Sequence, residues 1–536
     1  MRRLVSLLWV LVFVPMCMSV IGCDQEQEPQ PAIGLSATSH DFGPDETEWS
    51  FDIWNAGDPG STLDWEVSAD KTWISLSRNA GASTATNDRA TVNVMIDRRE
   101  LDKATHSGSI IISAPPASSR TIGLTVSIGG EGEGEVWYVD NLNASGTEDG
   151  TGWETAFTAI QDGINAATDG DIVLVAEGTY VENIHVDGKD IVLRSTDPAN
   201  PQVVAATVID GNQSGSVVSF AGTETEACVL SGFTITNGSA FEVYGGGICG
   251  GAWGVARTYA TIRNNTITGN AVDWGDGGGL YGCHGTIENN TISDNLAYGG
   301  GGGGLYGCDG TIQNNTITGN SSEWGGGLDS CLGTIQNNTI TGNSAEYGGA
   351  LYGCHGTIDS NVITGNTVDW GDGGGMCGCD GTIQNNMIYG NSACFGGALN
   401  SCHGAIRNNT ITANSAEYGG GLDSCDASIQ NCILWGNTAF EGAQLRGGSP
   451  PEYSCIQDWN GGGPGNITLD PQLAGTQNGD LHLQATSPCI DAGRLVQDLP
   501  EDFEGHTRGF DGSAEARGDG SDYDIGADEF VGTAIE

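Results

Sequence analysis

Basic residues are scarce in this chain of 536 residues. Eighteen Lys and Arg stand against 68 Asp and Glu, which gives a net charge of −50, and no Lys or Arg lies between Arg263 and Arg407. Nucleic-acid binding needs basic patches that neutralise phosphates, so this composition argues against nucleic acid as a partner. Self-repulsion on this scale favours bound divalent cations, and the oxygens of Asp and Glu suit Ca²⁺ as a cofactor.

Helical periodicity is also absent from Thr261 to Pro450. This stretch instead repeats text of the form TIQNNTITGN…YGGGLYGCHG at intervals of 23 or 25 residues, and such a period indicates a solenoid. Each copy holds three short runs separated by Asn, Gly and acidic turn residues, which predicts an all-β, right-handed parallel β-helix with three strands per coil. The eight copies begin at Thr261, Thr286, Thr311, Thr334, Thr357, Thr382, Ala405 and Ser428.

Equivalent residues of successive coils in such a fold stack about 4.8 Å apart, so each repeat position becomes a column. Two Ile columns are predicted to form the core, and a column of Asn is predicted to hydrogen-bond between coils. The first Ile column runs from Ile262 to Ile429, the second from Ile267 to Ile411, and the Asn column from Asn270 to Asn437.

Sixteen cysteines would suggest disulfides in an exported protein. Seven of them form a single column, where parallel side chains point the same way and oppose the dihedral angle that a disulfide needs. We expect these seven to be buried free thiols, whereas Cys455 and Cys489 lie outside the repeats and could pair. The column comprises Cys283, Cys308, Cys331, Cys354, Cys379, Cys402 and Cys425.

The N-terminus predicts export. Residues 1–22 combine Arg2 and Arg3 with an apolar run that is too short to span a bilayer, followed by Cys23. The text VIGC resembles the bacterial lipobox. The resemblance implies cleavage before Cys23, lipidation of its thiol, and a membrane-anchored lipoprotein at the cell surface or in the periplasm of a bacterium.

Residues 31–128 have ordinary charge and alternating strand patterns, and the Gly/Glu linker 129–135 ends them. The segments LDWEV, TWISLS and HSGSIIIS resemble the BACON module, an immunoglobulin-like β-sandwich. That resemblance implies either carbohydrate binding or a spacer, and no exposed site in the sequence favours binding.

Residues 136–531 are predicted to form the β-helix with a cap at each end. Phe157, Ile160, Ile164 and Ala167 share one helical stripe, which predicts a short helix over the first coil. The segments GTYVENI, SPCIDAG and DIGADEF resemble bacterial pectin-lyase-like proteins of the choice-of-anchor Q type. This resemblance implies the fold but no particular activity.

An acidic residue followed by an aromatic one recurs at one edge of the repeats. Carboxylates beside exposed rings suit the hydroxyls and CH faces of sugars, so these rings are candidates for glycan binding. The alternative is that the rings fold over the neighbouring Gly residues as packing. The candidates are Trp274, Trp324, Tyr347, Trp370 and Tyr418, with Phe395 at the same position.

Two further groups of residues are candidates for metal binding. Asp519, Asp522 and Asp524 could bind a metal or form a solvated acidic turn. A column beside the cysteines alternates imidazole and carboxylate, and it either holds a metal or forms turns at a solvated edge. Its members are His284, Asp309, Leu332, His355, Asp380, His403 and Asp426.

These features favour a lipid-anchored β-helix protein that presents an extended surface to glycan or cell-surface material. The alternative is a polysaccharide-degrading enzyme. Lyases of this fold typically use Lys or Arg as the base, which the middle coils lack, whereas a glycoside hydrolase needs two carboxylates. Near-identical coils argue against a single active site within the repeats. If there is one, we expect it in the most divergent coils, at residues 236–260, which include Arg257 and Tyr259.

The lipobox generates a direct prediction. Cys23→Ser should release the protein from membranes or leave it unprocessed, because the acylated thiol is lost, whereas Cys17→Ser should change neither. Membrane fractionation with mass spectrometry of the N-terminus measures both outcomes. Unchanged membrane association of the Cys23→Ser protein would reject the anchor.

Overall fold

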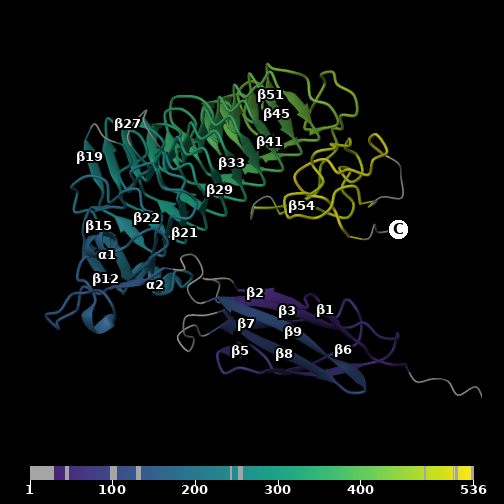
Figure 1. The fold of residues 1–536 in the computed structure, drawn as a ribbon. Helices are drawn as coiled ribbons and strands as arrows, with labels where there is room; N and C mark the ends of the chain where they lie inside the picture. The colour runs from purple at the N-terminus through teal and green to yellow at the C-terminus, as the bar shows by residue number, and fades with distance from the viewer. Residues whose placement is uncertain are drawn as a thin grey trace, which may run out of the picture. The chain divides into compact units, whose positions relative to one another are not determined.

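The structure is a computed structural model that describes residues 29–42, 48–96, 105–127, 134–241, 244–251, 257–475, 479–510, 512 and 517–532. The chain forms two compact units (Figure 1). The predicted signal peptide 1–22, Cys23 and residues 129–133 of the predicted linker lie outside the described residues.

The first unit is a β-sandwich whose core lies between two sheets. Strand β4 (Leu63–Ala69) alternates buried and exposed residues, and its Leu63 and Trp65 pack with Phe51 and Val92 of the opposite sheet. One sheet has the order β1 (Ile33–Leu35), β3 (Glu48–Asn55), β7 (Ala90–Ile96), β5 (Ile74–Leu76). The other has the order β2 (Ser39–Asp41), β9 (Ala117–Ser127), β8 (Thr105–Ala114), β4, β6 (Ala80–Ser83).

The second unit is a right-handed parallel β-helix, as predicted. Each coil adds one strand to each of three parallel sheets, which hold 12, 12 and 11 strands. The first sheet runs from β10 (Val136–Val139) to β49 (Ser428–Gln430), and the second from β12 (Gly178–Val181) to β52 (Cys455–Ile456). The third runs from β13 (Ile184–His185) to β51 (Leu445–Arg446).

The middle coils carry a fourth short strand that the sequence did not indicate. It forms a sheet of eight strands from β19 (Ser239–Phe241) to β47 (Ser415–Tyr418). A typical coil contains β29 (Thr311–Gln313), β30 (Thr316–Thr318), β31 (Ser321–Trp324) of this fourth sheet, and β32 (Leu328–Asp329). The acidic-aromatic pairs of the sequence therefore lie on or directly after an extended strand.

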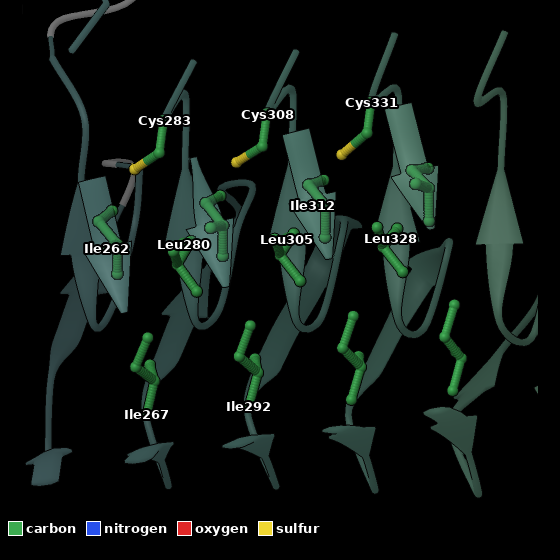
Figure 2. Packing of buried hydrophobic residues seen from close by; sticks show 14 of the residues in the cluster. Ile262, Ile267, Leu280, Cys283, Ile292, Leu305, Cys308, Ile312, Leu328 and Cys331 are labelled. Atoms are coloured by element: carbon green, nitrogen blue, oxygen red, sulfur yellow. The ribbon is translucent and has the colours of Figure 1, made fainter. Parts of the chain in front are cut away.

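The core of the solenoid consists of stacked identical side chains. Both predicted Ile columns are buried, with Ile312 and Ile335 fully inaccessible, and the third sheet adds an inward column of Leu and Met. Figure 2 shows Ile262, Leu280 and Cys283 pointing into the same interior, and the same arrangement repeats in the following coils. The predicted inward orientation of the Ile columns is confirmed.

Two columns of buried Asn run beside this core. Only one of them was predicted from the sequence. In the column that was missed, Asn315 Nδ2 donates to the carbonyl of Ile287 at 2.8 Å and to Asn338 Oδ1 at 3.0 Å. Asn315 Oδ1 accepts from the backbone N–H and the side-chain amide of Asn290 at 2.9 and 3.0 Å. Each amide thereby joins three coils, and its buried polar atoms are satisfied.

The predicted column from Asn270 to Asn437 bonds in the same manner. Asn320 Nδ2 donates to the carbonyl of Ile292 at 2.9 Å and to Asn343 Oδ1 at 3.0 Å. The left-handed turn conformation falls on the residue before each Asn, as at Asn314 with φ 56° and Gly319 with φ 66°. The side chain of the next residue is thereby directed inward at both corners of the coil.

All seven stacked cysteines are buried free thiols, as expected. Their Sγ atoms lie near backbone carbonyls two residues earlier in the chain, as for Cys331 and Asp329 at 3.5 Å. Cys455 and Cys489 share a second buried cluster and are also free. These side chains therefore pack as small apolar groups.

Helix α1 (Ile160–Ala166) packs on the first coil. Phe157 and Ala167, which were expected on the same helical stripe, lie just outside it, and Phe157 instead forms a parallel bridge with Val139. The buried face of α1 holds Ile160 and Ile164, and the carboxylate of Glu182 accepts from the backbone N–H of Ile160 at 2.8 Å. A second helix, α2 (Pro201–Ala206), lies between β14 (Val192–Ser195) and β15 (Thr207–Asp210). No helix of the described residues is long and apolar enough to cross a bilayer.

The C-terminal cap folds back onto the last coils. It contains the hairpin β53 (Leu473–Gly475) and β54 (Asp480–Leu483) and a buried ion pair between Arg508 and Glu529 at 3.4 Å. Arg508 Nη2 donates to Asn385 Oδ1 at 2.8 Å, and the backbone N–H of Ala527 donates to Thr410 Oγ1 at 3.0 Å. These bonds fasten the cap to the outside of the late coils.

The packing of the Ile columns predicts a large cost of truncation. Ile335→Ala should lower the free energy of unfolding by about 2 to 4 kcal/mol, because the coils above and below hold the cavity open. Thr339→Ala, at an exposed position of the same coil, is the control and should change it little. Chemical denaturation measures both, and a loss below about 1 kcal/mol for Ile335→Ala would contradict its inward placement.

Candidate functional site

An aromatic ridge follows the turn between the fourth and third sheets, with one ring in each of eight successive coils. Trp370 is 89% exposed, Trp274 64% and Tyr347 38%, whereas the side chains of Trp324 and Tyr418 are half-buried. All five candidate rings thus belong to one surface. The aromatic ridge comprises Trp274, Tyr298, Trp324, Tyr347, Trp370, Phe395, Tyr418 and Phe440.

The packing of the rings differs along the ridge. Trp274 and Tyr298 meet edge to face with centroids 5.8 Å apart, and both remain exposed. Phe395 and Tyr418 stack at 5.2 Å, and the guanidinium of Arg446 lies over both rings, 4.8 Å from that of Tyr418. The packing alternative therefore describes Phe395 and Tyr418, while the rings near Trp274 and Trp370 are available to a ligand.

Tyr298 and Phe440 were not among the sequence-derived candidates, although both are largely exposed. Tyr298 pairs with Asp273, so it occupies the position that is acidic in most other coils. Phe440 lies one residue before Glu441, which pairs with Tyr418. A search for one ring per coil, without a preceding acid, would have found both.

Two carboxylates lie at the base of the ridge, in the copies where the turn reads DWGDGGG. Burial raises the pKa of both Asp276 and Asp372. Asp276 Oδ1 accepts from the backbone N–H of Gly301 at 2.8 Å, in the following coil. The insertions that distinguish these coils therefore place a partly desolvated acid beside an exposed Trp.

Asp276 belongs to a cluster on the outer face of the third sheet, which we call the carboxylate cluster: Asp276, Tyr281, Tyr306 and Asp329. Tyr281, Tyr306 and Asp329 occupy the same outward position of three successive coils, and the two tyrosine rings stack at 5.6 Å. Gly301 is required here, because a Cβ at that position would overlap Asp329 Oδ2. Both carboxylates therefore converge on Gly301.

The cluster is strongly desolvated. Burial, reinforced by the nearby carboxylate of Asp276, raises the pKa of Asp329 to about 8, against the lowering effect of a hydrogen bond from Ser330 Oγ at 2.7 Å. Burial likewise raises the pKa of Tyr281 and of Tyr306 to about 12. At neutral pH Asp329 is therefore mainly a neutral acid and both phenols are protonated, so the cluster offers several hydrogen-bond donors.

Arg257 supplies a cation to this cluster from the irregular segment between the early coils. Its guanidinium lies 4.8 Å from the ring centroid of Tyr281, with Nη2 3.5 Å from the phenol oxygen, and its buried Nη1 has no hydrogen-bond partner. Tyr259, in the same segment, is exposed and lies instead 6.1 Å from His284. The structure thus separates the two residues that the sequence grouped together.

The alternating His and Asp side chains form hydrogen bonds between successive coils. The backbone N–H of Asp309 donates to His284 Nδ1 at 3.1 Å, and that of His403 donates to Asp380 Oδ1 at 3.0 Å. Each side chain in these pairs thus accepts from the following coil. Two shallow hollows of about 310 and 420 Å³ lie along this edge.

The three acidic candidates near the C-terminus do not converge. Asp524 is buried, and its two oxygens accept from the backbone N–H groups of Asp491 and Phe530, each at 2.7 Å. Asp519 instead accepts from Leu495 and Ser521. The bond from Asp491 joins SPCIDAG to DIGADEF. Burial and the nearby charge of Glu529 raise the pKa of Asp524 to about 8.

Comparisons with known proteins support the fold. Residues 196–376 match the family model described as right handed beta helix region. No curated protein matches the chain at a significant level.

Solved structures are similar at low identity. Pectate lyase Pel9A is 14% identical over 75% of this chain and 98% of its own, with a TM-score of 0.39. The periplasmic chaperone SfaE is 12% identical over 18% of this chain and 59% of its own, with a TM-score of 0.17. A Bacteroides ovatus GH5 xyloglucanase is 14% identical over 28% of this chain and 37% of its own, with a TM-score of 0.15. At these values no activity is carried over.

The raised pKa of Asp329 predicts a pH-dependent effect of its neutralisation. The contribution of Asp329 to the free energy of unfolding is fully present below the pKa that its carboxyl group has in the unfolded chain. That contribution is lost as the pH rises from there to the folded pKa of about 8. Asp329→Asn should therefore gain stability relative to the parent protein between pH 4 and 8, by on the order of a few kcal/mol. Denaturation at several pH values measures it, with the exposed Asp273→Asn as control, and parallel profiles would contradict the assignment.

Proposed function

We propose that this protein is an exported, lipid-anchored β-helix protein that binds a carbohydrate polymer along the aromatic ridge. The observation that carries the proposal is the repetition of a ring in eight successive coils, five of them exposed. Neighbouring coils are about 4.8 Å apart, which is close to the length of one sugar residue in an extended chain. Successive rings can therefore contact successive sugars.

The chemistry of the ridge suits sugars. Aromatic faces pack against the CH faces of a sugar ring, while the acidic residues beside them accept hydrogen bonds from hydroxyl groups. Asp273, Glu346, Asp369 and Glu417 are exposed next to Trp274, Tyr347, Trp370 and Tyr418. The acidic surface favours a neutral polymer over a strongly anionic one unless cations such as Ca²⁺ bridge the two.

The N-terminal parts of the chain are consistent with a solenoid that is presented at a membrane surface. The lipobox-like text at Cys23 supports an anchor, and the sandwich between it and the solenoid would act as a spacer. Its resemblance to the BACON module supports this role. Cell-surface material and the membrane are thus the proposed partners.

A second candidate function is glycoside hydrolysis at the carboxylate cluster. The specific observation in its favour is that Asp276 and Asp329 converge on Gly301 while burial keeps Asp329 protonated at neutral pH. A protonated carboxyl is the group that donates to a leaving glycosidic oxygen, and a second carboxylate serves as base or nucleophile. The cluster lies beside Trp324, whose backbone pairs with Gly301.

Ring substitutions test the binding proposal. Trp324→Ala should weaken binding about fivefold, because each ring contributes about 1 kcal/mol, whereas replacing Trp274, Trp324, Tyr347 and Trp370 together by Ala should abolish it. A glycan array with and without Ca²⁺ identifies the ligand, and calorimetry then measures affinity. Trp153→Ala, an exposed Trp of the same unit away from the ridge, is the control. Full binding by the fourfold variant would refute the proposal.

The same ligand separates the two functions. Reducing sugar released by the parent protein and lost with Asp329→Asn alone would favour hydrolysis over binding. Binding without product, and unchanged by Asp329→Asn, supports the ridge as the functional surface.

A further inference from the structure

Three side chains from separate segments of the C-terminal cap converge on one point. His482 comes from β54, Glu504 from the loop that follows Leu499, and Asp528 from the DIGADEF segment. Each offers one ligand atom, and these atoms all lie within 4.8 Å of one another. His482 Nε2 already lies 3.1 Å from Glu504 Oε1.

The surrounding groups orient these three side chains. Asp480 Oδ1 lies 2.6 Å from His482 Nδ1, which leaves Nε2 facing Glu504. Metal-binding histidines are usually held by such a carboxylate on the second ring nitrogen. The backbone N–H of Leu483 donates to Asp528 Oδ2 at 2.8 Å, and Asp502 accepts from the backbone N–H groups of Glu504 and His506. Both the strand and the loop are thereby fixed.

Glu504 also lines a hollow at the edge of the cap. This hollow of about 440 Å³ lies between the solenoid and the cap, and Asp502 and Glu504 belong to its wall together with Asp359 and Gln384. A metal ion held by three protein ligands would have a further coordination position for water or a small ligand.

We infer that His482, Glu504 and Asp528 form a binding site for a divalent transition-metal ion, with Zn²⁺ as the ion that fits best. One imidazole and two carboxylates are ligands that Zn²⁺ accepts at about 2.0 to 2.2 Å, whereas Ca²⁺ prefers six or more oxygen ligands. Bound Zn²⁺ would link β54, the loop and the DIGADEF segment, and so hold the cap together. The inference is independent of the proposed glycan-binding function.

Zinc titration of the full chain tests the site. Protein treated with a chelator and then dialysed should bind one Zn²⁺ in calorimetry and unfold at a higher temperature when Zn²⁺ is present. Glu504→Gln should weaken Zn²⁺ binding on the order of 100-fold because it removes a ligand. Asp480→Asn removes only the carboxylate that orients His482, so it should weaken binding about tenfold. Co²⁺ in place of Zn²⁺ should show visible absorption bands that Glu504→Gln removes.

The matched control is Glu501→Gln, which removes the same charge from an exposed position of the same loop. It should bind Zn²⁺ like the parent protein. Because Glu504 is exposed, its substitution leaves the core intact, and circular dichroism verifies this. Equal affinities of the Glu501→Gln and Glu504→Gln proteins, absence of stoichiometric Zn²⁺ binding, or displacement of Zn²⁺ by equimolar Ca²⁺ would each overturn the assignment.

Discussion

The hydrogen bonds between buried Asn side chains of successive coils are the constraint on which the rest of the solenoid depends. Each amide bonds to the coil before and the coil after, as Asn320 does with Asn295 and Asn343 at 3.0 Å. An unpaired amide in this interior would cost about 1 to 3 kcal/mol, so a coil must present Asn at the same two corners as its neighbours. The columns thereby fix register, and insertions are confined to the Gly-rich turn. The missed column ends where Cys432 replaces Asn, at the coil that meets the cap.

This fixed register explains where chemistry can appear. Interior positions must repeat, but outward positions of the third and fourth sheets are free to vary between coils while keeping their spacing. In the aromatic ridge, the outward positions repeat one kind of side chain in successive coils. In the carboxylate cluster, equivalent outward positions carry different side chains, namely Tyr281, Tyr306 and Asp329. The two extra residues of DWGDGGG turns add Asp276 and Asp372 without disturbing the core. A polymer-binding surface and a single desolvated acid can therefore coexist on one scaffold.

Much of the fold could be predicted from the sequence because its signal is periodic: the repeat length, the Ile columns, the stacked thiols and the short helix α1 all follow from it. Periodicity could not say which Asn of each adjacent pair is buried, since Asn314 takes the left-handed turn and Asn315 the interior. It identified six ridge rings but missed Phe440 and also Tyr298, which stands at an acidic position. The carboxylate cluster and the His482 site were missed because they depend on contacts between non-equivalent positions, such as Asp276 with Gly301, and on the fold of the non-repetitive cap.

The central claim is that one polymer lies along many coils. It is tested most directly by the dependence of affinity on ligand length, measured by calorimetry with oligosaccharides of the polymer that the protein binds. A surface of eight rings predicts that affinity rises with each added sugar up to about eight residues, because further contacts form without a new loss of translational freedom. Affinity that stops rising at two or three sugars would show a single pocket instead, and would contradict binding along the ridge.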